Sequence, residues 1–124
     1  MRIGELARRA GVSARSLRYY EQHGLIEARR GENGYREYDE ADVKLVSEIR
    51  SLLTVGFTLE DARPFVACLR AGHPSGGSCA ESVAVYRRKL TEIDDDLRTL
   101  LERRAEVAAQ LNAACRGCVR RGET

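Results

Sequence analysis

Apolar residues at the start of the chain recur at the spacing of short helices. The first set shows an i, i+3, i+4, i+7 pattern, and Gly11 is expected to end its helix. A second helix is predicted from an N-cap at Ser13 to a C′ glycine at Gly24. The first apolar set is Ile3, Leu6, Ala7 and Ala10. Two short helices joined by a tight glycine turn indicate a helix-turn-helix.

The next segments predict a hairpin and two more helices. Residues 27–38 read as two short runs around a Glu-Asn-Gly turn, which is typical of a β-hairpin. Asp39 and Thr58 each stand at N-cap spacing before an apolar-periodic stretch, so each is expected to begin a helix. Pro64 lies inside the later helix and should remove one backbone hydrogen bond. Residues 71–78 are a loop by composition.

The most regular pattern in the chain follows this loop. Ser78 and Glu81 fit a capping box that would make Cys79 the first helical residue. Apolar side chains then alternate steps of three and four over about four heptads, with one break at Arg104. The seam positions are Val83, Tyr86, Leu90, Ile93, Leu97, Leu100, Val107 and Leu111. Because no second helix in the chain could cover this seam, we expect a homodimer built on a coiled coil.

The second helix has an outer face suited to DNA. Leu17 and Tyr20 can turn inward, which leaves Arg15, Arg18 and Tyr19 outward as long side chains able to reach phosphates or base edges. A hairpin beside such a helix can act as a wing, and its candidate contacts are Arg36 and Tyr38. A solvated arginine face is the alternative interpretation.

Composition narrows the class of protein. Residues 1–36 carry eight arginines against four acidic residues, whereas residues 37–62 carry two basic against seven acidic residues. A basic head attracts a phosphate backbone, although a surplus of arginine is also common in proteins encoded by GC-rich genomes. No run approaches the roughly 18 apolar residues of a membrane helix, and the N-terminus lacks a signal-peptide core. We therefore expect a cytoplasmic protein, whose cysteines bind metal, sense oxidants or pack.

The pieces IGELA, GVS, LRYYE, GLI and GYREY, with their spacing over residues 2–43, resemble the DNA-binding head of the MerR family of transcriptional regulators. The resemblance implies a mainly α fold with a winged helix-turn-helix head and a long antiparallel dimerisation helix. It also implies a promoter-binding regulator, not an enzyme, that untwists or kinks an overlong promoter spacer for RNA polymerase. The expected regions are a head at 1–38, a helical connector at 39–72, a loop and dimerisation helix at 73–112, and an effector tail at 113–124.

Three cysteines become neighbours if two long helices pair antiparallel. Along one helix Cys79 and Cys115 lie about 50 Å apart, so within one subunit they cannot share a ligand. About a two-fold axis, Cys79 of one chain would face Cys115 and Cys118 of its partner. MerR-family regulators are built on such an antiparallel pair, and the resemblance supports that orientation.

Three soft thiolates suit Zn²⁺, Cd²⁺, Hg²⁺ or Pb²⁺. In the divalent-metal sensors that this chain resembles, a cysteine likewise opens the dimer helix, whereas monovalent sensors carry serine there. The usual metal-binding loop is longer between its cysteines than the Cys115–Cys118 spacing. His73 is a candidate extra ligand, and Cys68 is expected to be a small packed residue.

Other classes of function remain open at this level. The main alternative is a redox sensor that switches by oxidation of Cys115 and Cys118, or of Cys79. A family iron–sulfur cluster would need four tail cysteines, and two are present. A thiol–disulfide exchange enzyme would need a βαβ scaffold that the pattern lacks. A drug-triggered regulator would need an aromatic-lined effector domain, yet no aromatic residue follows residue 111.

Overall fold

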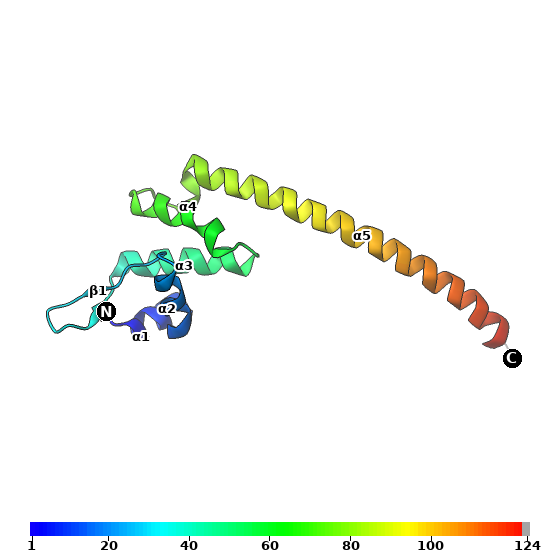
Figure 1. Ribbon diagram of the computed structural model, residues 1–124, viewed down its shortest axis with the longest axis horizontal. Helices are drawn as coiled ribbons and strands as arrows, with labels where there is room; N and C mark the ends of the chain where they lie inside the picture. Colours follow the sequence, from blue (N-terminus) through cyan, green and yellow to red (C-terminus); the bar gives the residue numbers. More distant parts are fainter. Residues whose placement is uncertain (123–124) are drawn as a thin grey trace. The chain divides into compact units, whose positions relative to one another are not determined.

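A computed structural model describes the backbone of residues 1–122 and the side chains through Arg116. It divides into two compact units, one spanning Met1–Tyr86 and one beginning at Arg87. The mainly helical fold with a two-stranded hairpin confirms the predicted class. Its elements are α1 (Ile3–Ala10), α2 (Ala14–Gln22), β1 (Arg29–Arg30), β2 (Arg36–Glu37), α3 (Glu40–Thr54), α4 (Leu59–Arg70), a short 3₁₀ turn η1 (Gly76–Ser78) and α5 (Ala80–Gly122) (Figure 1).

The helix-turn-helix forms as its caps predict. Gly11 takes the left-handed conformation, with φ 73°, that lets the chain turn directly from α1 toward α2. The Ser13 side chain accepts a hydrogen bond from the backbone N–H of Ser16 at 3.0 Å, which caps α2. Gly24 also has a positive φ, of 73°, just beyond the end of α2. These three local signals mark the end of α1 and both ends of α2.

The hairpin is short and antiparallel. Its register pairs Arg29 with Glu37 and Arg30 with Arg36. Gly34 has a φ of 79° at the tip, as the Glu-Asn-Gly turn requires. The N–H of Tyr38 donates to the carbonyl of Met1 at 2.8 Å, and this bond ties the second strand to the N-terminus.

Helix α3 is the centre of the first unit. It lies between the α1–α2 pair and α4 (Figure 1). Capping boxes begin both long connector helices, with Asp39 and Asp42 at α3 and Thr58 and Asp61 at α4, as predicted. One buried cluster joins α1, α2 and α3. A second cluster, around Phe65, joins the end of α3 to α4.

The junction before α5 differs from the prediction. Ser78 belongs to η1 and its hydroxyl bonds to that of Ser75 at 2.8 Å, so it does not cap α5. Cys79 has an extended backbone and its carbonyl accepts the N–H of Val83 at 3.1 Å, which places it just before the helix instead of inside it. The predicted capping box does not form, because the Ser78 hydroxyl is already hydrogen-bonded to Ser75 in the η1 turn.

Helix α5 is anchored by a buried serine. The Ser82 side chain is fully buried, and its hydroxyl donates to the carbonyl of Gly76 at 2.5 Å. The helix continues to Gly122, beyond the residue 112 boundary that the apolar pattern indicates. Among the described residues, none of the helices combines the length and apolarity that crossing a membrane requires.

Candidate DNA-binding face and thiol site

Helix α2 presents a free polar face. Leu17 and Tyr20 are buried against the head core, as predicted, which fixes the rotation of the helix. Arg15, Arg18 and Tyr19 are exposed on the other side. Within the described part of the chain neither of these guanidinium groups has an ion-pair partner. Two uncommitted arginines on a rigid helix can approach phosphates or base edges without first breaking an internal bond.

Tyr19 is positioned by the end of its own helix. Its ring is 49% exposed and lies 4.2 Å, centroid to centroid, from the ring of His23. The Nδ1 atom of His23 lies 2.9 Å from the carbonyl oxygen of Tyr19. Tyr19 therefore packs against His23 and remains half-exposed.

The two wing residues have different environments. Arg36 remains partly exposed and forms an ion pair with Glu21 at 3.2 Å, which holds the strand against α2. Tyr38 is 3% exposed, and its hydroxyl donates to Glu21 at 3.4 Å. Burial, together with the neighbouring Glu21 carboxylate, raises the pKa of Tyr38. The Tyr38 ring therefore belongs to the head core, unlike the exposed side chain that the hairpin pattern suggests, and its contact with DNA stays a prediction.

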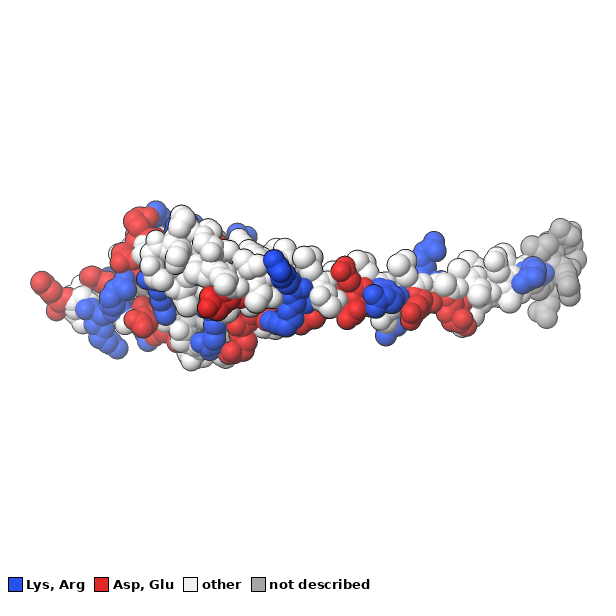
Figure 2. Space-filling model, turned by 90° about the horizontal axis from the view of Figure 1, so that it is seen from above, with Lys and Arg blue, Asp and Glu red and all other residues white. Residues whose placement is uncertain are grey.

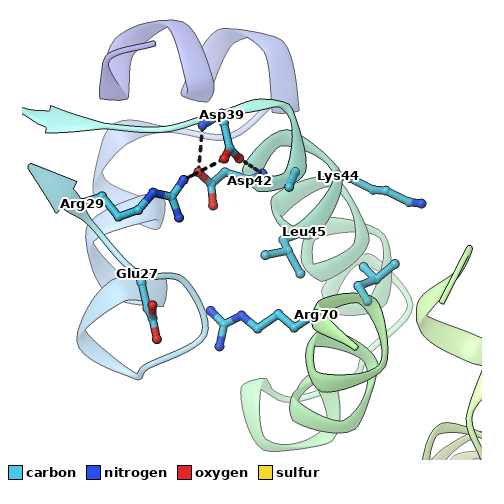
Figure 3. A pocket seen from close by; sticks show the side chains of 9 residues that line it. Glu27, Arg29, Asp39, Asp42, Lys44, Leu45 and Arg70 are labelled. Atoms are coloured by element: carbon cyan, nitrogen blue, oxygen red, sulfur yellow. Dashed lines mark hydrogen bonds and ion pairs between the residues drawn. The ribbon is translucent and has the colours of Figure 1, made fainter. Parts of the chain in front are cut away.

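An ion-pair network fixes the root of the wing. Arg29 of β1 reaches Asp39 at 3.0 Å and the buried Asp42 at 2.8 Å, as Figure 3 shows. Arg70 extends from α4 across the same hollow and donates to the carbonyl of Leu25 at 2.7 Å. These polar groups are mutually satisfied. The ion pairs of Arg29 with Asp39 and Asp42 therefore hold the wing against the start of α3.

The charged surface is mixed. On the face seen in Figure 2, Lys and Arg side chains alternate with Asp and Glu side chains. Several arginines of the head are already paired internally, including Arg9 with Glu40 and Arg29 with Asp42. The positive charge available to DNA on α2 therefore comes from Arg15 and Arg18, and the head as a whole is not uniformly basic.

An uncovered apolar stripe runs along α5. The predicted seam side chains are between 36% and 65% exposed, and Leu101 adds another exposed apolar group at 66%. Tyr86 differs from the other seam residues because its ring also packs edge-on against Phe57 and Phe65. The ring centroids lie 5.9 Å and 4.9 Å away. A line of this many exposed large apolar side chains is typical of an interaction surface.

The thiols are arranged differently from the expectation. Cys79 is joined by a disulfide to Cys68 of the same chain, with Cα atoms 5.9 Å apart. Cys68 is buried as predicted, but it is not merely a packing residue. The ligand atoms of Cys68, His73 and Cys79 all lie within 4.8 Å of one another. The structure thus brings the predicted pair, His73 and Cys79, together with a cysteine that the sequence pattern did not connect to them.

The remaining two cysteines lie on the distal part of α5. Cys115 is a free, exposed thiol. The side chain of Cys118 lies outside the described residues, so its part in the predicted site stays a prediction. The sequence signal for Cys68 was its separation of 11 residues from Cys79 across a glycine-rich loop, which is short enough to bring the two thiols together.

Residues 1–67 match the family described as MerR HTH family regulatory protein. The HTH-type transcriptional regulator HmrR of Rhizobium leguminosarum bv. viciae is 36% identical over 117 residues, covering 94% of this chain and 88% of that protein. The heavy metal-dependent transcription regulator 2 of Rhizobium meliloti (strain 1021) is 36% identical over 105 residues, covering 81% of this chain and 71% of that protein.

A solved structure is similar over most of the chain. The transcription regulator PbrR691 from Ralstonia metallidurans CH34, crystallised in complex with lead(II), gives a TM-score of 0.71 at 28% identity. The match covers 86% of this chain and 81% of that one. These relatives are transcription regulators and not enzymes, which confirms the prediction of a non-enzymatic role.

Proposed function

The chain belongs to the MerR family of DNA-binding, helix-turn-helix transcription regulators, and we propose that it acts as a homodimer that changes the shape of promoter DNA when its thiols bind a soft divalent metal ion. Two heads would bind the two halves of a pseudo-palindromic element, beside RNA polymerase and in the cytoplasm. The observation that carries the proposal is the outer face of α2, where Arg15 and Arg18 are exposed without ion-pair partners and Tyr19 is half-exposed.

The dimer rests on the apolar stripe of α5. Its seam side chains would each bury apolar area against a second copy, and that area contributes about 25 cal/mol per Å². An antiparallel pair related by a two-fold axis brings the start of one α5 beside the end of the other. This arrangement gives two equivalent sites in which Cys79 of one subunit meets Cys115 and Cys118 of the other.

The metal assignment rests on the donor set. Cys115, and Cys79 once its disulfide to Cys68 is reduced, supply soft sulfur ligands, and His73 adds an imidazole beside Cys79. Thiolate-rich sites select Zn²⁺, Cd²⁺, Hg²⁺ or Pb²⁺ over harder ions. One relative is heavy metal-dependent by name and another was crystallised with lead(II), which supports a metal effector of this class.

Ligand binding across the dimer couples to DNA through the junction of α4 and α5. A metal that binds one arrangement of the two heads more tightly shifts the population toward it, by its differential affinity for the two states. The favoured arrangement would bend or untwist a spacer that holds the promoter elements out of alignment.

A redox switch is the second candidate, and a specific contact favours it. Cys79 is bonded to Cys68, so an oxidant that forms this disulfide removes a thiolate from the proposed metal site. The closing of one disulfide oxidises two thiols by two electrons and releases two protons. This candidate uses Cys79 as the sequence allowed, but with Cys68 as its partner in place of the tail cysteines.

A subunit-mixing experiment tests the cross-subunit site. We would combine a Cys79→Ser subunit with a subunit that carries Cys115→Ser and Cys118→Ser, using distinct affinity tags to isolate the heterodimer. Each homodimer lacks every complete site, whereas the heterodimer regains one. We therefore expect metal-dependent transcription in vitro to be absent from both homodimers and to return in the heterodimer to about half the wild-type response.

The same mixture separates the alternatives. A site made of Cys79, Cys115 and Cys118 of the same subunit predicts no recovery in the heterodimer, because neither chain holds all three of these thiols. Operator binding without metal should be unchanged in all three dimers, and this measurement is the control for correct folding. A Cys79→Ser homodimer that still responds fully to metal would contradict the proposal.

A further inference from the structure

Cys68 and Cys79 connect the head to the start of the long helix. Cys68 lies on α4, whose neighbouring side chains Phe65 and Val66 are buried in the head core. Cys79 immediately precedes α5. A bond or a shared ligand between these sulfurs therefore links α4 directly to the first turn of α5.

His73 is held beside the two sulfurs by the loop between them. Its backbone N–H donates to the carbonyl of Cys68 at 3.3 Å. Gly72, with a φ of 94°, reverses the chain so that this bond can form. The His73 side chain is exposed, whereas Cys68 is buried and Cys79 is half-buried. The three ligand atoms lie within 4.8 Å of one another, so a cation placed among them could contact all three after small side-chain rotations.

The chemistry of this cluster matches a borderline-soft cation. Two thiolates on a tetrahedral Zn²⁺ lie roughly 3.7 Å apart, given Zn–S bonds of about 2.3 Å, and imidazole nitrogen binds at about 2.0–2.1 Å. Cys68 and Cys79 both line a surface hollow that opens to solvent, and one carboxylate, Glu81, and one guanidinium, Arg63, line it with them.

We propose that reduced Cys68, His73 and Cys79 form a Zn²⁺-class site within one subunit, separate from the site between subunits. A dithiol reductant reduces this disulfide to two protein thiols and is itself oxidised to a disulfide. Metal binding then displaces the two thiol protons. Because Cys79 is common to both sites, the internal site and the cross-subunit site compete for it. The internal site does not depend on the cross-subunit site, so either can fail alone.

The test uses the full chain with Cys115→Ser and Cys118→Ser, which removes the two tail thiols that the cross-subunit site requires and keeps Cys79. The protein is reduced with a dithiol, freed of reductant under argon and titrated with Co²⁺ as the spectroscopic probe for Zn²⁺. We expect one Co²⁺ per subunit, with thiolate charge-transfer bands for two sulfurs and the visible bands of tetrahedral cobalt. His73→Ala should weaken this binding by at least the roughly 10–100-fold that even changes in outer-shell partners cost.

Two further measurements distinguish loss of the metal site from misfolding of the variants. Adding Cys68→Ser should abolish the thiolate bands, whereas the neighbouring Ala67→Ser should leave them intact and serves as the matched control. In the background that keeps Cys68 and Cys79, bound Zn²⁺ should protect both thiols from alkylation and delay their closure by a mild oxidant, as peptide mass analysis would show.

The outcomes are distinct. Absence of thiolate bands in the reduced background, or bands that survive Cys68→Ser, would overturn the internal site. Recovery of activation in the subunit-mixing experiment together with no Co²⁺ binding here would retain the cross-subunit site alone. Thiolate bands in the Co²⁺ titration, with no recovery of activation in the subunit-mixing experiment, would support the internal site alone.

Discussion

The arginines of the head differ in whether they are already paired. Arg9, Arg29 and Arg36 each have an acidic partner within the head, whereas Arg18 on α2 has none in the described residues. We expect Arg18→Ala to weaken operator binding and to lower the slope of log affinity against log salt by about one, since one phosphate contact would be lost. Fluorescence anisotropy over a series of salt concentrations measures both quantities.

The matched control for this substitution is Arg103→Ala. Arg103 is an exposed arginine on α5, so its loss changes the net charge equally without altering α2. Its salt slope should equal that of the wild-type protein. An Arg18→Ala slope that equals the wild-type slope would remove Arg18 from the phosphate contacts.

A buried side-chain hydrogen bond from Ser82 secures the start of α5 to η1. The Ser82 hydroxyl donates to the Gly76 carbonyl at 2.5 Å, and both residues are buried. Ser82→Ala leaves that carbonyl without this donor, so we expect the free energy of unfolding to fall by about 1–3 kcal/mol. Chemical denaturation measures the change. Ser51→Ala, at an exposed position of α3, is the control and should stay within about 0.5 kcal/mol of wild type.

At the scale of elements, the N-terminus of α3 holds the wing. Asp39 accepts the N–H of Asp42 at 3.2 Å and pairs with Arg29 of the first strand at 3.0 Å. The backbone hydrogen bond from Asp42, with support from Arg29, lowers the pKa of Asp39. Because the folded-state pKa lies below the unfolded one, this stabilisation is present above the unfolded pKa and is lost as pH falls through the lowered folded value.

Two substitutions separate the cap from the charge. Asp39→Ala removes both and should destabilise the protein by about 1 kcal/mol at neutral pH. Asp39→Asn keeps an equally good cap and cannot titrate, so its stability near neutral pH should stay close to wild type. The wild-type curve should fall more steeply than the Asn curve below about pH 4. Identical acid limbs in urea denaturation would contradict a role for Asp39 ionisation.

At the scale of the whole molecule, the proposed homodimer rests on the seam of α5. Leu97 is 52% exposed in the single chain and belongs to the predicted seam. Leu97→Asp places a charge in the dimer twice, and we expect it to cost about 3 kcal/mol or more of association free energy from lost apolar burial alone. That cost raises the dimer dissociation constant by more than about 100-fold. Sedimentation equilibrium measures the constant.

Thr99→Asp is the control for the seam. It introduces the same charge two residues away, on the side of α5 that the heptad pattern leaves outside the seam. It should leave the dissociation constant within a few-fold of wild type. If both variants remain equally dimeric, the seam is not the dimer interface. If both dissociate equally, the effect comes from charge on the helix and not from the seam.

Local signals in the sequence determined most of the head. Gly11, Ser13 and the Asp39 capping box fixed helix ends through interactions within a few residues, so the pattern alone placed them correctly. The LRYYE stretch likewise gave the exposed and buried faces of α2, since helical periodicity alone decides them. These features need no knowledge of distant contacts.

Only the tertiary structure decided which residues meet across elements. Tyr38 looked like an exposed wing residue, yet the fold packs its ring into the core beside Glu21. Cys68 and Cys79 looked unrelated, yet the loop that carries His73 brings their sulfurs together, while η1 takes Ser78 away from its expected cap. Helix periodicity and capping depend on neighbours in sequence, whereas burial and thiol pairing depend on how α2, α4 and α5 are placed by the rest of the chain.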